Sequence, residues 1–169
     1  SMRNVRLLVV AAVAAAVAAP AATSDAGART AGAATPCHAA VATGVLPVWA
    51  RSGFSGPRPR LPHVLGRSGR IAALLFGYPL RSPTAPDRNN KILWVPRHFP
   101  NHVAALWIKM QQMDGTRPVG APVRRIISGG PGPSLVDAPS AGCWRFTLSW
   151  SGRRDTLDDC VEHLFDADA

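Results

Sequence analysis

Polar and apolar residues alternate most regularly in residues 144–150. In this segment, WRFTLSW, an aromatic or aliphatic residue occupies every second position, and Arg, Thr or Ser fills the positions between. Successive side chains of a β-strand point to opposite faces, so the pattern predicts a strand with one buried and one solvated face. It also places Cys143 in the solvated row, together with Arg145 and Thr147.

Other apolar segments extend this prediction. Residues 70–80 are apolar on both faces, as in a central strand, and residues 91–95 follow a polar turn and are expected to pair with them. Residues 102–113 fit either a strand or one face of a helix, and we expect a strand because the neighbouring segments are strands. Residues 123–127 and 45–50 are shorter strand candidates.

Proline and glycine interrupt the chain roughly every 8 to 15 residues from about position 37 onward. Long helices do not tolerate such interruptions. Short apolar segments between turns are typical of an antiparallel β-sandwich or barrel. We therefore predict one all-β domain over residues 37–157, built from about seven short strands.

The pattern changes near the carboxyl terminus. Apolar residues at positions 157, 160, 161, 164 and 165 follow helical spacing, and Thr156 stands where an N-cap is expected. We predict that the acidic tail, residues 158–169, carries a short amphipathic helix that covers the open end or edge of the sandwich. The alternative is a last strand over residues 155–161, which is the poorer fit because Asp159 would lie in its buried row.

The amino-terminal segment has the features of an export signal. Ser1 precedes Met2 and is interpreted as a cloning remnant, Arg3 and Arg6 supply a positive region, and residues 7–19 form an apolar run too short to span a bilayer. Small residues follow, so we predict a signal peptide over residues 1–28 and a leader over residues 29–36. The mature protein is expected to be secreted or cell-surface associated, with no transmembrane span.

The chain is strongly basic. Its formal net charge is +9, and 13 Lys and Arg stand against two Asp in residues 51–125, whereas six acidic residues stand against two arginines from position 153 on. Genome base composition is one explanation, because Arg, Ala, Gly and Pro all have GC-rich codons. The other is a basic surface for an anionic partner. The arginines that we expect to bind anions lie in or near the 51–70 and 117–125 loops: Arg58, Arg60, Arg67, Arg70, Arg124 and Arg125.

The sequence contains no clear catalytic motif. Residues 66–69, GRSG, are not a nucleophile elbow, and the Gly-rich residues 128–134 lack the lysine of a phosphate-binding loop. His98 and His102, with Met110 and Met113 nearby, have the ligand types of a copper or zinc site. Histidines four apart on a strand stand about 13 Å apart, however, so we predict no metal there and no cofactor.

The chain resembles small secreted or surface-attached proteins of GC-rich Gram-positive bacteria that have an Ig-like β-sandwich. The resemblance rests on the early Cys37 and on the late Gly142-Cys143-Trp144 segment that opens strand 144–150, after a Pro/Gly-rich run at 129–133. It covers roughly residues 37–157. It implies an Ig-like fold and a location outside the cell, and it implies no activity.

Three cysteines in an exported chain allow one intramolecular disulfide. The resemblance implies the pair Cys37 and Cys143, which leaves Cys160 as a candidate free thiol. A bridge that closes so long a loop is expected to stabilise the fold by a few kcal/mol. The alternative pair is Cys143 and Cys160.

These observations favour a non-enzymatic, exported module that binds an anionic polymer or a protein at the cell surface. Nucleic acid is disfavoured as a partner, because an exported protein meets wall polymers, glycans and lipid head groups first. A metal-binding protein or enzyme built on His98 and His102, and a structural domain without a ligand, are the alternatives.

Overall fold

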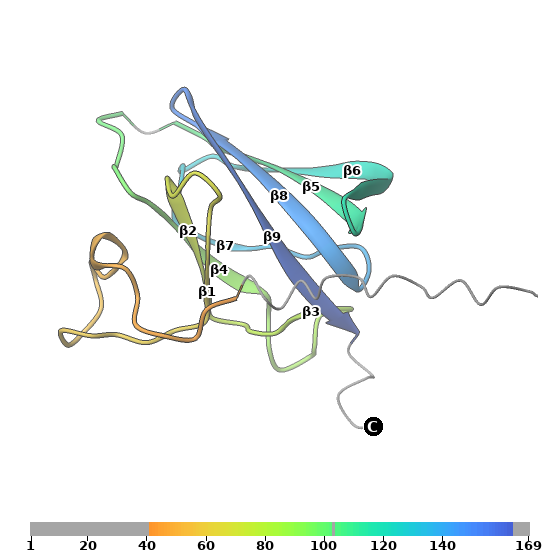
Figure 1. Cartoon of the computed structure of the whole chain (residues 1–169), viewed down its shortest axis with the longest axis horizontal. Coiled ribbons are helices and arrows are strands. Elements are labelled where there is room, and N and C mark those ends of the chain that lie inside the picture. Colours follow the sequence, from red (N-terminus) through yellow and green to blue (C-terminus); the bar gives the residue numbers. More distant parts are fainter. Residues whose placement is uncertain (1–40, 103, 164–169) are drawn as a thin grey trace, which may run out of the picture. The chain divides into compact units, whose positions relative to one another are not determined.

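The computed structural model describes residues 41–102 and 104–163. These residues contain two β-sheets (Figure 1). The four-stranded sheet has the order β1-β2-β4-β7, and the five-stranded sheet has the order β3-β9-β8-β5-β6. The nine strands are β1 (His63–Leu65), β2 (Ile71–Leu75), β3 (Leu80–Ser82), β4 (Lys91–Pro96), β5 (Leu106–Asp114), β6 (Arg117–Ile127), β7 (Pro133–Leu135), β8 (Gly142–Trp150) and β9 (Arg153–His163). The all-β prediction is confirmed, with more strands than the seven expected.

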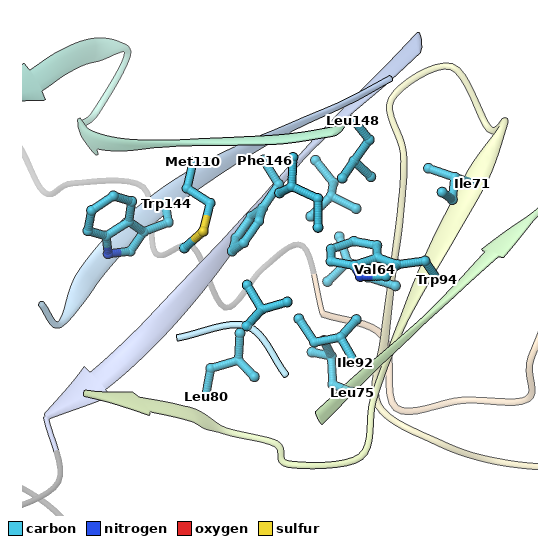
Figure 2. Packing of buried hydrophobic residues seen from close by; sticks show 14 of the residues in the cluster. Val64, Ile71, Leu75, Leu80, Ile92, Trp94, Met110, Trp144, Phe146 and Leu148 are labelled. Carbon is cyan, nitrogen blue, oxygen red and sulfur yellow. The ribbon is translucent and has the colours of Figure 1, made fainter. Parts of the chain in front are cut away.

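The main core lies between the two sheets. Alternation along β8 buries Trp144, Phe146, Leu148 and Trp150, as the sequence predicts, and leaves the intervening side chains partly exposed. Figure 2 shows side chains of β8 and β5 meeting those of β2 and β4. The rings of Trp94 and Phe146 lie 6.2 Å apart between centroids, so the two sheets pack through direct aromatic contact.

A second apolar cluster covers the outer face of the four-stranded sheet. Leu46 and Ala50, from the segment that precedes β1, pack against Ala72, Leu74 and Val95. This contact explains why all five residues of β2 are buried, since one row faces the sandwich core and the other faces this segment. The strand expected at residues 45–50 is wrong, because Val48–Ala50 forms a 3-10 turn.

The predicted carboxyl-terminal helix is wrong over the described residues. Residues 153–163 form β9, and residues 153–161 of it pair with β8. Asp155, Leu157, Asp159 and Val161 form its buried row, so the strand alternative is correct in spite of its two inward carboxylates. Residues 164–169 lie outside the described part.

Two further predictions are refined. Residues 91–95 pair with residues 71–75 as expected, but the 70–80 segment breaks after β2, and β3 joins the other sheet. The β3–β9 pair is parallel, whereas the other pairs of named strands are antiparallel. Residues 106–114 form a strand, which confirms the choice of strand within 102–113. None of the described helical turns is long and apolar enough to cross a bilayer.

Candidate functional site

The outer face of the five-stranded sheet carries basic and hydroxyl side chains in ordered rows. Strand register sets Trp107 beside Ser149 and Ser149 beside Arg154, and in the next row it sets Arg124 beside Lys109 and Lys109 beside Thr147. Directly opposed side chains on one face have Cβ atoms about 4.5–5.5 Å apart. One depression is lined by Ile108 and by six residues that we call the basic face: Trp107, Lys109, Arg124, Thr147, Ser149 and Arg154.

The three cations of the basic face form no ion pair with any described carboxylate. Lys109 and Arg124 are direct cross-strand partners, and like charges in that position disfavour each other. The ring of Trp107 is half exposed, although β5 has a neighbouring strand on each side. Hydroxyl groups of Thr147 and Ser149 lie between the cations and can donate hydrogen bonds. The arrangement suits an anion that also has hydrogen-bonding and ring surfaces.

Asp158 lies at one side of the basic face and forms ion pairs with two arginines. Its carboxylate accepts hydrogen bonds from Arg145, with Nε to Oδ1 at 2.8 Å, and from the Nη2 of Arg67. Partial burial raises the pKa of Asp158, but the hydrogen bonds and charges of Arg145 and Arg67 outweigh it and leave that pKa below its usual value. Asp158 is therefore ionised, and it neutralises part of the charge at this edge.

The loop between β1 and β2 is fixed to the sheet by Asp155. This buried carboxylate accepts hydrogen bonds from the backbone N–H groups of Ser68 at 2.9 Å and Arg70 at 2.8 Å. The backbone N–H of Arg67 donates to the carbonyl of Thr156 at 2.8 Å. These contacts place Arg67 and Ser68 in a depression that they share with Arg145 and Arg154, next to the basic face.

The six arginines predicted to bind anions are spread over several parts of the surface. Arg124 lies on the basic face and Arg67 lies beside it. Arg125 belongs to the opposite row of β6, as the partner of buried Ile108. Arg58 and Arg60 belong to the segment before β1, and Arg70 lies at the end of the sandwich with other basic residues.

The candidate metal ligands are not brought together. His98 and His102 are exposed in the connection between β4 and β5, whereas Met110 and Met113 are buried. Figure 2 shows Met110 among the core side chains, between Trp144 and Phe146. Within residues 41–102 and 104–163, no group of three or more His, Cys, Asp or Glu side chains is arranged to hold a metal ion.

The cysteine predictions are only partly covered by the described residues. Cys143 and Cys160 are direct cross-strand partners, but their Sγ atoms are 3.8 Å apart, far beyond the ~2.05 Å of a disulfide. Cys37 lies outside the described part, so its pairing with Cys143 stays a prediction. Cys143 does belong to the partly exposed row of β8, as the alternation predicts.

Four residues of the basic face were not singled out from the sequence: Lys109, Thr147, Ser149 and Arg154. Trp107 was not singled out either. Alternation along β5 and β8 carried the missing signal, since it places residues 107 and 109 outside in one strand and residues 147 and 149 outside in the next. The order of the strands in the sheet, which makes these rows adjacent, is not encoded in any local pattern.

Comparisons of the chain with protein-family models, with curated proteins and with solved structures find no match.

Proposed function

We propose that this protein is an exported, non-enzymatic β-sandwich module that binds an anionic glycan polymer at the cell surface through the basic face. The observation that carries the proposal is the convergence of Lys109, Arg124 and Arg154 on one depression without a carboxylate partner among the described residues. Cations that repel one another gain stability when a polyanion lies across them.

Two features favour a glycan over other anionic partners. Trp107 offers a half-exposed aromatic face against which the apolar face of a sugar ring can pack. Thr147 and Ser149 offer hydroxyl groups between the cations, where they can bond sugar hydroxyls. An export signal in residues 1–28 would bring the protein to such polymers, and the Ig-like resemblance is consistent with that location.

Replacing the three cations of the basic face tests the proposal. We expect Lys109→Gln/Arg124→Gln/Arg154→Gln to weaken binding to heparin, used as the glycan probe, by tenfold or more at low salt. The slope of log K against log salt should also fall by about two to three, because each neutralised charge contributes about 0.7–0.9. Trp107→Ala should weaken binding about threefold to tenfold and leave the slope unchanged.

The matched control removes three positive charges elsewhere. Arg58, Arg60 and Arg88 are exposed and lie away from the basic face, so Arg58→Gln/Arg60→Gln/Arg88→Gln should keep most of the affinity. If this control variant loses as much affinity as the first, binding depends on net charge alone and the assignment to the basic face is wrong. Absence of salt-sensitive heparin binding by the wild-type protein would reject the proposed function altogether. Uncharged dextran serves as the ligand control.

A further inference from the structure

A second basic cluster lies at the end of the sandwich where three connections meet. Arg70 ends the β1–β2 loop, Arg97 and His98 follow β4, and Arg153 begins β9 (Figure 1). All four side chains line one depression, together with Ser68 and Gly69. We call this group the end cluster, and it shares no residue with the basic face.

Backbone pairing forces these charges together. The register of β2 with β4 pairs Ile71 with Pro96, so Arg70 and Arg97 stand opposite each other one position further on. The backbone N–H of Arg97 donates to the carbonyl of Arg70 at 2.8 Å. Opposed like charges disfavour the pairing that joins them, and an anion bound between them would remove that cost.

The remaining contacts keep the end cluster assembled. Arg153 Nη1 donates to the carbonyl of His98 at 3.3 Å, and Arg70 Nη1 donates to the carbonyl of Arg154 at 3.4 Å. Gly69 has a φ of +62° and no side chain, and the position that its Cβ would take lies 4.0 Å from Arg97 Nη1. The glycine therefore leaves the depression open beside this guanidinium.

No described carboxylate forms an ion pair with the side chains of the end cluster. Arg70, Arg97 and Arg153 form no ion pair within residues 41–102 and 104–163. The carboxylate of Asp155 lies beneath the loop, where its two oxygens accept the backbone N–H groups of Ser68, Arg70 and Thr156. Asp155 thus orders the loop and leaves the side chains of the end cluster available.

We propose that the end cluster is a binding site for a phosphate group. Each guanidinium presents a planar fork of N–H donors that matches two oxygens of a tetrahedral oxyanion. Three such forks, with the hydroxyl of Ser68 and the imidazole of His98, suit a compact anion with several oxygens better than a single carboxylate. This site goes beyond the proposed glycan binding and does not depend on it.

Titration of the full-length protein with inorganic phosphate, followed by NMR chemical shifts, tests the site. We expect saturable shifts at Ser68, Gly69, Arg97 and His98 in the wild-type protein. Arg97→Gln and Arg70→Gln should each weaken phosphate binding about tenfold or more, as expected when a charged hydrogen-bond donor is lost. Arg60→Gln, an exposed arginine of the segment before β1, should change it less than twofold. Thermal unfolding checks that each variant is folded.

The same variants identify the source of the phosphate. Poly(glycerol phosphate) in solution and phosphatidylglycerol vesicles both carry phosphodiesters, and dependence on Arg97 in one assay assigns the physiological source. Phosphate binding without Arg97-dependent binding to either assigns the site to the free ion. Absence of saturable shifts, or equal affinity in wild type and Arg97→Gln, overturns the proposal. The triple variant of the basic face should keep phosphate binding, so failure of one proposal is separable from failure of the other.

Discussion

Two carboxylates in the buried row of β9 behave differently because of their surroundings. Asp155 accepts three backbone N–H groups from two segments, so both of its carboxylate oxygens have hydrogen-bond partners. Asp159 is almost fully buried, and its Oδ1 accepts the backbone N–H of Cys160. Desolvation raises the pKa of Asp159 to about 7 and outweighs the opposing effect of that hydrogen bond.

Replacing Asp159 by asparagine should therefore stabilise the protein at alkaline pH. Between about pH 4 and pH 7 the folded state holds a proton that the unfolded state releases, so the free energy of unfolding falls as pH rises through this window. The full penalty, present above pH 7, is on the order of 4 kcal/mol. We expect Asp159→Asn to match wild type near pH 4 and to exceed it by a few kcal/mol at pH 8, measured by denaturant unfolding.

Asp158 supplies the control for that experiment, because its pKa moves the other way. Its salt bridges stabilise the folded state above the unfolded pKa, and this contribution is lost as pH falls through the lower folded pKa. Asp158→Asn should thus destabilise at neutral pH and lose its effect in acid. If Asp159→Asn shows the same pH profile as Asp158→Asn, then Asp159 is ionised in the folded protein and its assignment here is wrong.

Among the elements, the β1–β2 loop depends on a close contact between backbone and carboxylate. A Cβ on Gly66 would lie 2.2 Å from Asp155 Oδ2, and that oxygen is held by the backbone N–H of Arg70. Gly66→Ala should therefore destabilise the protein by about 2–4 kcal/mol, because the carboxylate cannot move without losing hydrogen bonds. Thermal or chemical unfolding measures this change.

Two comparisons isolate that contact. Gly129 has open space around the position of its Cβ, so Gly129→Ala should be close to neutral. Asp155→Ala removes the clash, so Gly66→Ala should cost much less in the Asp155→Ala background, and the double-mutant cycle should give a coupling above about 1 kcal/mol. Additive effects would mean that Gly66 and Asp155 do not meet.

The inward-facing residues of β8 and β9 explain why the sequence predicted the sheets better than the carboxyl-terminal element. In β8 every inward residue is apolar, so alternation alone identifies the strand. In β9 the inward row includes Asp155 and Asp159, and this broke the expected alternation and favoured a helix. Two of the three backbone N–H groups that the Asp155 carboxylate accepts belong to residues more than 80 positions away in the chain. A local pattern holds no record of such partners.

The basic face and the end cluster could not be identified from the sequence, for a related reason. The outward row of β8 could be read from its alternation, but the adjacency of Lys109, Thr147 and Arg154 depends on which strands pair and in which register. The end cluster depends on three connections that are distant in sequence. Counting arginines therefore located the charge of residues 51–125 along the chain but could not say which of these side chains meet in space.

At the scale of the molecule, the two outer faces of the sandwich have different roles. The segment before β1 covers the four-stranded sheet with apolar side chains, so that face is closed by the chain itself. The outer face of the five-stranded sheet carries the basic face, and the end cluster lies at one end of the sandwich. Both proposed binding sites therefore lie on surface that no segment of residues 41–102 or 104–163 covers.

The predicted Cys37–Cys143 disulfide would also act at the scale of the molecule, since it would join the amino-terminal leader to the beginning of β8, the central strand of the five-stranded sheet. Cys143 is partly exposed on the outward row of β8, where a covering segment could reach it. Closing a loop of about a hundred residues removes enough chain entropy from the unfolded state to stabilise folding by about 4–5 kcal/mol. Non-reducing peptide mapping should recover a Cys37–Cys143 peptide, and Cys37→Ser should lower the free energy of unfolding by several kcal/mol. A Cys143–Cys160 peptide in its place would contradict the pairing and would require the two Sγ atoms, now 3.8 Å apart, to approach.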